Sequence, residues 1–164
     1  MKFLADVADP VTVLGQQVSL MWIIIGAALV VFMQAGFALV ETGFTQAKNA
    51  AHVVSTNFAI FGLGFIGFYL VGFSFSFGGF SYSAFGMDAP VGSALIGSGD
   101  WIFFWKGGWA LTGDAITPAA IGFFLYMVAF MDTTATIPTG SMAERWKFKS
   151  FVIWGLFCGA IYYP

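Results

Sequence analysis

An uncharged apolar run of about 22 residues constrains this chain more than any other feature. The run extends from Ser19 to Val40 and is followed by Glu41. As a helix it would be roughly 33 Å long, enough to cross the hydrocarbon core of a bilayer. A second uncharged run, from about Ala50 to Gly72, predicts a second span. The chain is therefore predicted to be an integral membrane protein.

The amino-acid composition supports this class and excludes several others. Hydrophobic residues make up 59% of the 164 residues and charged residues only 9%, whereas soluble domains average roughly 25% charged residues. The net charge of −2 gives no electrostatic basis for binding nucleic acid. One histidine and one cysteine are too few for an ordinary zinc site or a disulfide framework. No nucleophile–base pair or phosphate-binding glycine loop is legible, so we predict neither an enzyme nor a cofactor.

Two further apolar stretches bring the expected number of spans to about four. The expected ranges are 19–41, 50–72, 116–143 and 150–164. The last range would form about 22 Å of helix, less than the roughly 30 Å hydrocarbon core. Residues 73–113 are rich in glycine and serine, and their tryptophans favour the membrane–water boundary, so we expect a loop there. The predicted fold class is an all-α membrane bundle that is truncated after about four spans.

The charged residues outside the spans divide between the two sides of the predicted bundle. Lys48, Arg145, Lys147 and Lys149 fall on one side, whereas two lysines and five aspartates fall on the other. The positive-inside rule places the basic side in the cytoplasm and the N-terminus outside. We therefore expect a multi-pass protein of the cell membrane.

The third predicted span contains more polar residues than a lipid-facing helix tolerates. Asp132 lies within it, and Thr133, Thr136 and Pro138 follow. Polar side chains in hydrocarbon need partners, so this helix is expected inside the bundle. An intramembrane acid favours a proton or cation site, and the alternative is a structural acid bonded to neighbouring threonines. Pro138 removes a backbone hydrogen bond, so we expect a kink there.

Helical periodicity separates the residues of this span into two stripes. One stripe contains Asp132 and Thr136, which are a possible intramembrane polar site. The other contains Tyr126, Phe130 and Thr133. The acid is therefore expected to lie away from the aromatic pair. We interpret Tyr126, Phe130 and Thr133 as the better candidates for lining a substrate pathway.

The turn after the first predicted span is flanked by opposite charges. We interpret Glu41 and Lys48 as an interfacial pair that holds this turn, in preference to a chemical site. His52 lies just inside the second span and is interpreted as a hydrogen-bonded helix residue. None of these three residues is therefore predicted to carry chemistry.

Two stretches together resemble the ammonium transporter family (Amt/Mep/Rh). Residues 33–49, which read MQAGFALVETGFTQAKN, are similar to the family's first-helix exit. Residues 130–145 are similar to its third-helix pattern, which ends Ala-Glu-Arg, and residues 69–78 resemble its second-helix exit. The matched signature residues are Gly36, Glu41, Gly43, Lys48, Asn49, Gly140, Glu144 and Arg145.

The resemblance implies transport of ammonium or ammonia by a homotrimer in which every protomer has its own pore. It implies that Tyr126 stands at the outer aromatic position of the gate, where the family usually has Phe followed by Gln. Here Met127 follows instead. The pore histidines and the recruitment site belong to later helices of the family. We therefore expect an N-terminal portion that does not conduct alone, because the second half of the repeat is missing.

Two other functions stay open at the level of the sequence. One is an ammonium sensor, in which the same fold works with a signalling domain or a regulatory signalling protein. The departures at Tyr126, Met127 and Asp132 leave this open. The other is a small proton-coupled four-helix exporter that uses Asp132 or Glu41, although the long loop and the matched motifs count against it. Conduction of the gas and net transfer of charge are equally open.

Overall fold

The longest element is α1, a helix of 35 residues from Pro10 to Phe44. The computed structural model describes residues 9–99, 101–113 and 117–164. α1 begins well before the first predicted span because Asp9 caps it, accepting a hydrogen bond from the amide of Val11 at 3.3 Å. Pro10 then occupies the first turn, where it costs no hydrogen bond. The helix therefore begins before residue 19, where the first predicted span starts.

The second long helix is built from four consecutive segments. A short 3₁₀ turn, η1 (Ala47–Asn49), leads into α2 (Ala50–Gly67). A π-helical turn, η2 (Phe68–Gly72), and the short helix α3 (Phe73–Phe77) continue it. The helical segment therefore extends past the end of the second predicted span, at Gly72, as far as Phe77.

The third helix is interrupted where proline occurs. α4 runs from Pro118 to Thr136, and α5 runs from Thr139 to Met142. The interruption at residues 137–138 agrees with the expected kink at Pro138. Residues 114–116, at which the third span was expected to start, lie outside the described part of the chain. The last helix consists of α6 (Phe148–Phe157) and a π-helical turn, η6 (Cys158–Tyr162).

An antiparallel β-hairpin lies in the segment that was expected to be a loop. Its strands are β1 (Ser93–Ser98) and β2 (Trp101–Lys106), and they form a two-stranded sheet. Two single 3₁₀ turns flank it, η3 (Ser83–Phe85) and η4 (Trp109–Leu111). The structure is therefore mostly helical, and the hairpin is the one element that the all-α expectation missed in the described residues.

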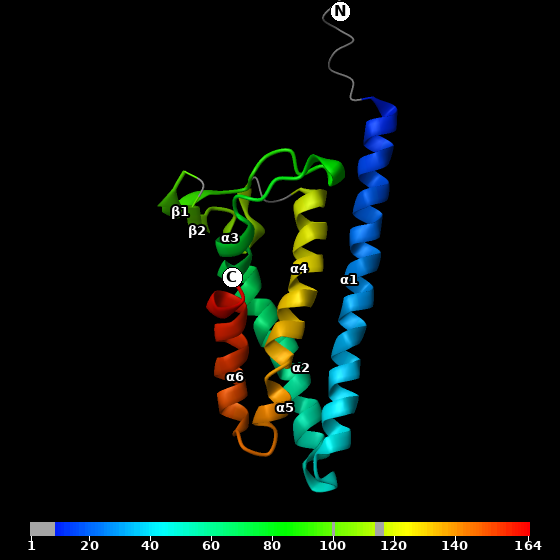
Figure 1. Cartoon of the computed structure of the whole chain (residues 1–164), viewed down its shortest axis with the longest axis vertical. Helices are drawn as coiled ribbons and strands as arrows, with labels where there is room; N and C mark the ends of the chain where they lie inside the picture. The colour runs from blue at the N-terminus through cyan, green and yellow to red at the C-terminus, as the bar shows by residue number, and fades with distance from the viewer. Residues whose placement is uncertain (1–8, 100, 114–116) are drawn as a thin grey trace, which may run out of the picture.

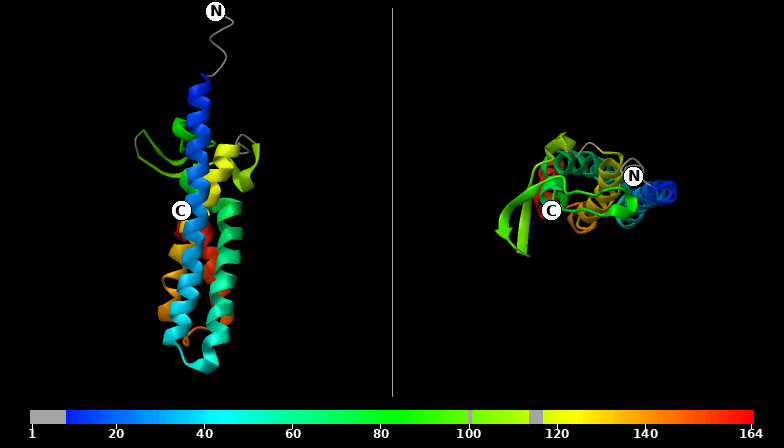
Figure 2. Two further views of the ribbon diagram at one scale, coloured as in Figure 1. Left: turned by 90° about the vertical axis from the view of Figure 1, so that its right-hand side faces the viewer. Right: turned by 90° about the horizontal axis from the view of Figure 1, so that it is seen from above.

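The helices form a bundle in which α4 is central (Figure 1). α4 packs against α1 on one side and α2 on the other, and α6 packs against α2. Figure 1 and the left-hand view in Figure 2 show the hairpin at one end of the bundle, which we call the hairpin end. The α1–α2 turn and the α5–α6 turn lie at the opposite end, which we call the turn end (Figure 1).

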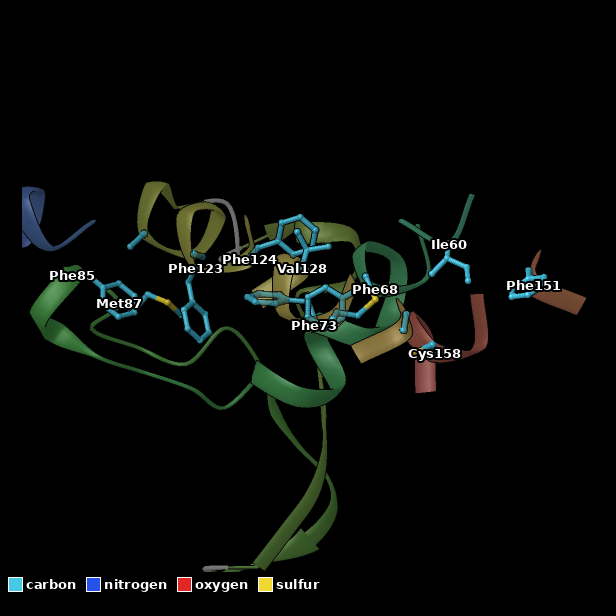
Figure 3. Close-up of a cluster of buried hydrophobic side chains, with 14 residues drawn as sticks. Ile60, Phe68, Phe73, Phe85, Met87, Phe123, Phe124, Val128, Phe151 and Cys158 are labelled. Atoms are coloured by element: carbon cyan, nitrogen blue, oxygen red, sulfur yellow. The ribbon is translucent and has the colours of Figure 1, made fainter. Parts of the chain in front are cut away.

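Aromatic rings fill the core near the hairpin end. The rings of Phe68 and Phe124 stack with centroids 5.7 Å apart, and Phe73 meets Phe124 edge-to-face at 5.4 Å. Phe123 stacks on Phe80 at 4.6 Å. Figure 3 shows this cluster continuing through α2 toward Phe151 and Cys158 of the last helix. Such ring pairs add roughly 0.5–1.5 kcal/mol each beyond the area that they bury.

Glycines bring α2 and α6 into backbone contact. A Cβ atom on Gly67 would lie 2.7 Å from the carbonyl oxygen of Leu156, and one on Gly159 would overlap the carbonyl oxygen of Gly64. The two π-helical turns, η2 and η6, pack against each other beside these contacts. Small residues at such crossings are typical of helix packing in membranes, where close backbone approach replaces the hydrophobic effect.

Three helical segments of the described chain are long and apolar enough to cross a membrane. They are Pro10–Phe44, Ala47–Phe77 and Pro118–Met142, and the apolar segment Phe148–Tyr162 is shorter. Much of the apolar surface of α1 is exposed, including Leu29, Phe32 and Leu39. The predicted class, a helical bundle of the membrane type, is confirmed.

Candidate functional site

A buried carboxylate, Glu41, joins three helices near the turn end. Its Oε2 accepts a hydrogen bond from Nδ2 of Asn57 in α2 at 2.8 Å, and its Oε1 accepts one from the hydroxyl of Thr139 in α5. All three side chains are more than 90% buried. The predicted pairing of Glu41 with Lys48 is wrong, because the carboxylate turns into the bundle and is satisfied by neutral donors.

Gln34 extends these contacts toward the middle of the bundle. Its Nε2 donates to the backbone carbonyl of Asn57 at 2.9 Å, and its Oε1 accepts from the hydroxyl of Thr136 at 2.9 Å. One side chain of α1 thus binds both α2 and α4. The two contacts satisfy the Gln34 amide in a region where an unmet polar group costs several kcal/mol.

Asp132 lies at the far end of this chain of contacts. It is 2% exposed, and the Thr136 hydroxyl lies 3.5 Å from its Oδ1 and 2.8 Å from its backbone oxygen. A hydroxyl has one proton, so Thr136 shares it among these acceptors and Gln34. We call the whole set the polar network; its members are Gln34, Glu41, Asn57, Asp132, Thr136 and Thr139.

Part of this network was predicted from the sequence. Helical periodicity placed Asp132 beside Thr136, and the structure also brings them together. Gln34 and Asn57 were not predicted as partners, although each is an uncharged polar residue within an apolar run. That signal is the same one that drew attention to Asp132, but it does not show which helices meet.

The interruption of the third helix allows Thr139 to join the network. The hydroxyl of Thr139 also lies within hydrogen-bond distance of the backbone carbonyl of Thr136, across the break at Pro138. Its single proton is therefore shared between this carbonyl and the Glu41 carboxylate. Gly140 follows, and a Cβ atom there would lie 3.6 Å from Oε1 of Glu41. The proline therefore positions a short helix against the buried carboxylate.

The aromatic stripe of α4 consists of Tyr126 and Phe130, with Thr133 below them. The two rings meet at an angle of 60° with centroids 4.9 Å apart. Phe130 is 37% exposed, whereas Asp132 is almost fully buried on another side of the helix. The hydroxyl of Thr133 bonds to the carbonyl of Ala129 of its own helix at 3.1 Å. The structure therefore separates the stripe from the acid.

A hollow of about 470 Å³ lies beside Tyr126 near the hairpin end. Tyr126 also packs against α1, since a Cβ atom on Gly26 would lie 3.0 Å from its ring. Aromatic faces attract cations, so such a lining suits a small ammonium-like ion. The residues that line the hollow are Ser19, Trp22, Ile23, Tyr82, Ala84, Phe85, Phe123 and Tyr126.

Glu144 ties the two turns together at the turn end. Its Oε1 accepts hydrogen bonds from the amide of Gln46 at 2.9 Å and from Nδ2 of Asn49 at 2.8 Å. The hydrogen bond from Asn49 has the largest effect on the pKa of the Glu144 carboxyl and lowers it from its usual value. The bond from Gln46 and the nearby charge of Lys48 lower this pKa further. Glu144 and Asn49, matched in separate stretches of the sequence, thus meet in the fold.

A second hollow opens at the same end, with a volume of about 750 Å³. Its lining includes the buried Glu41 and the exposed residues Gly140, Glu144 and Arg145. In residues 9–99, 101–113 and 117–164, no group of three or more His, Cys, Asp or Glu side chains could hold a metal ion. What this end offers instead is a polar hollow whose carboxylates are held by neutral donors.

Apolar helices of membrane-spanning length, joined by a polar network inside the bundle, define a polytopic helical membrane protein. The chain belongs to the Ammonium Transporter Family, whose sequence profile matches residues 21–164. The resemblance recognised in the sequence is thereby confirmed.

Known proteins agree with this membership. The chain is 35% identical over 148 residues to the ammonium transporter Amt2 of Archaeoglobus fulgidus, which covers 90% of this chain and 27% of that protein. It is 35% identical over 143 residues to the putative ammonium transporter sll0537 of Synechocystis, covering 87% and 23%. A solved structure called a sensor Amt protein matches with a TM-score of 0.72 and 30% identity, covering 92% and 33%. The chain thus spans about a quarter of the length of these two relatives.

Proposed function

We propose that this chain is the N-terminal part of a protein that transports ammonium or ammonia across the cell membrane. The observation that carries the proposal is the family match over residues 21–164, together with relatives that are named ammonium transporters. Family membership favours this function over a small proton-coupled exporter. It also favours a transporter over an enzyme.

The proposed substrate pathway runs along Tyr126, Phe130 and Thr133. The partial exposure of the Tyr126–Phe130 pair on one side of α4 supports this proposal, because a pathway needs accessible side chains. Aromatic faces stabilise an ammonium ion that has lost part of its water shell. The Thr133 hydroxyl is already bonded to its own helix, so it offers a polar surface without a strong site. Weak binding of this kind favours passage over retention.

The proposed role of Asp132 and Thr136 is to position the pathway helix. Both are buried with Gln34, away from the aromatic stripe. Their bonds fix the rotation of α4 relative to α1, and so determine which side of α4 presents Tyr126 and Phe130. The polar network in this proposal is a structural element of the pathway wall and not a binding site.

The proposed orientation places the turn end in the cytoplasm. Lys48, Arg145 and Lys147 lie in the segments that connect the helices at that end, and Lys149 lies in the first turn of α6; the positive-inside rule assigns this side to the cytoplasm. The N-terminus and the hairpin then face outward.

We also propose a homotrimer, which is supported by the exposed apolar surface of α1 that lipid or a second protomer must cover.

Growth of transport-deficient cells tests the proposed function. Cells that lack their own ammonium transporters and express the protein containing this chain should grow on low ammonium. The same cells with an empty vector are the control. Absence of growth, with the protein present in the membrane at normal levels, would rule out transport.

An ammonium sensor is the second candidate, favoured by the structural match to a protein called a sensor Amt protein. A sensor would bind ammonium and pass the signal to a domain or a partner. The discriminating observations are a signalling module in the reading frame beyond Pro164, and ammonium binding without uptake. Uptake without such a module would exclude the sensor.

A further inference from the structure

The β-hairpin carries exposed aromatic rings on one face. Trp101 and Phe103 are 78% and 71% exposed, and Ile96 on the partner strand is 55% exposed. The alternate residues Ile102 and Phe104 are partly buried, as the two-residue periodicity of a strand requires. Trp101 and Phe103 therefore form an exposed aromatic face, whereas Ile96, which pairs with Phe104, lies on the other face.

Several contacts hold the hairpin in a fixed position. The amide of Gly92 donates to the carbonyl of Gly78 at 2.6 Å. The ring of Phe104 packs against Phe75 of α3 with centroids 5.3 Å apart. The indole of Trp105 lies so close to Gly79 that a Cβ atom there would overlap it. The exposed rings are therefore presented in a defined direction from a rigid base.

The direction in which the hairpin extends is sideways. Figure 1 and the view from above in Figure 2 show it extending away from the helices, on the side opposite α1. It lies at the level where α3 ends, at Phe77, and where α4 begins, at Pro118. The apolar segments that end with α3 and begin with α4 therefore stop at the height from which the hairpin extends, whereas α1 continues beyond it (Figure 1). In a membrane-spanning protein, this height corresponds to the boundary between hydrocarbon and water.

Physical chemistry restricts what can cover this face. Both edges of a two-stranded sheet have unpaired backbone groups, which excludes a position within the hydrocarbon. Exposed aromatic rings are equally unfavourable in water, where such an edge promotes aggregation. The head-group region satisfies both requirements, since it hydrates backbone groups and is the preferred place for tryptophan. Among the described residues of the two strands only Lys106 is charged, and its sign suits lipid phosphates.

Apolar side chains are also exposed on two segments of the neighbouring helices. Leu70 of η2 is 49% exposed, and Ile161 and Tyr162 of η6 are 55% and 59% exposed. We propose that the exposed face of the hairpin formed by Trp101 and Phe103 is seated in the lipid head-group region and anchors this end of the protein at the membrane boundary. The proposal does not depend on which substrate the protein transports.

Site-directed spin labelling in liposomes of phosphatidylcholine and phosphatidylglycerol tests the proposal. The protein carries Cys158→Ala, and any cysteine outside residues 1–164 is replaced in the same way, so that only the introduced cysteine is labelled; the test site is Phe103→Cys. Asp88→Cys, on an exposed loop, is the aqueous reference, and Ile153→Cys, 70% exposed on α6, is the hydrocarbon reference. The ratio of oxygen to nickel-chelate accessibility at site 103 should lie between the ratios of the two references.

Two results would overturn the proposal. Accessibility at site 103 equal to that at site 88 would place the face in water. An immobilised label that neither oxygen nor nickel reaches would place it against protein, either a second copy or another part of the longer chain.

A conservative variant guards against damage to the fold. Trp101→Phe keeps an aromatic ring and removes one indole. Lipids brominated near the head group should quench the fluorescence of the original protein more than that of Trp101→Phe. Equal fractional quenching would contradict the proposal, because it would show that the Trp101 indole lies outside the lipid.

Discussion

At the scale of single residues, the structure satisfies a buried carboxylate without a cation. Glu41 receives its two hydrogen bonds from Asn57 and Thr139, whereas Lys48 lies in the turn outside. Neutral donors avoid the desolvation of a second charge, which is the larger cost when an ion pair is buried. The same bonds tie α1 to α2 and α5. Glu41 is therefore a residue that fixes helix positions.

Replacement of Asn57 by alanine measures this contribution. Asn57→Ala leaves a buried carboxylate oxygen without its donor, so the free energy of unfolding should fall by about 1–3 kcal/mol. Denaturation in mixed micelles with increasing SDS provides the measurement. Ser55→Ala is the matched control, because Ser55 is exposed and bonds only to its own helix at Ala51. A variant at position 57 as stable as the control would show that the Glu41 bond contributes little.

Replacement of Asp132 by asparagine tests whether this acid takes part in transport. Asp132 is buried on the side of α4 away from Phe130, so Asp132→Asn should leave the pH profile of ammonium uptake unchanged. Asparagine retains an acceptor for Thr136, which keeps the fold intact. A displaced pH profile, with normal expression, would instead show that the acid titrates in the transport cycle.

The tie at Glu144 should weaken in acid. Its folded-state pKa is lowered from 4.5 by the bonds from Asn49 and Gln46. A lowered pKa means that the stabilisation is complete above the unfolded value and is lost as the pH falls through the folded value. Hydrogen exchange of a peptide covering Gln46 should therefore show less protection, after correction for intrinsic rates, as the pH drops below about 4.5. Glu144→Gln should remove this pH dependence; if it persists in the variant, another group is responsible.

At the scale of elements, the contact between α2 and α6 depends on the absence of side chains. Gly159 and Gly67 each face backbone atoms of the opposite helix, and a Cβ atom on either would collide with a carbonyl oxygen. Backbone cannot move aside as a flexible side chain can. The last helix can therefore pack here only with glycine at both positions.

Gly159→Ala should separate the two helices and lower stability by about 1–3 kcal/mol or more, as overpacking does. Gly62→Ala is the matched control, because a Cβ atom on Gly62 meets nothing within 4 Å. Alanine there should be neutral or stabilising, since it favours the helix. Thermal denaturation in detergent compares the two variants. Equal melting temperatures would contradict the close packing of α2 and α6.

The elements that were predicted correctly are those whose signal lies within one short stretch of the sequence. Uncharged runs predicted the helices, and Pro138 predicted the break. The start of α1 at Pro10 was missed because Asp9 was not recognised as the residue that caps the helix. The hairpin was missed although Gly99 and Asp100 stand between apolar strands, which is a hairpin signal. Aromatic residues near a membrane boundary predict an interfacial loop equally well.

The candidate site was less accessible to sequence analysis than the fold. Periodicity within one helix separated Asp132 from Tyr126 and Phe130, because both stripes belong to α4. The partners Gln34 and Asn57 lie on α1 and α2, and their meeting depends on helix rotation and crossing. Neither helix rotation nor helix crossing can be read from a single segment of the sequence. Glu41 was assigned to the nearest opposite charge in the sequence, whereas in the fold its carboxylate faces the bundle.

At the scale of the whole molecule, these helices match only a part of the proteins to which they are similar. The family membership is certain from residues 21–164, while the chain spans about a quarter of the length of the relatives with which it was compared. The exposed stripe of Tyr126 and Phe130 and the bare apolar surface of α1 agree with a wall that further helices and lipid cover. Transport is therefore a property expected of the whole protein.

Uptake of labelled methylammonium into proteoliposomes tests the central claim most directly. The purified protein that contains this chain should accumulate label over time, above the level of empty liposomes, and unlabelled ammonium should compete. Correctly inserted protein that gives no more uptake than empty liposomes would contradict the account.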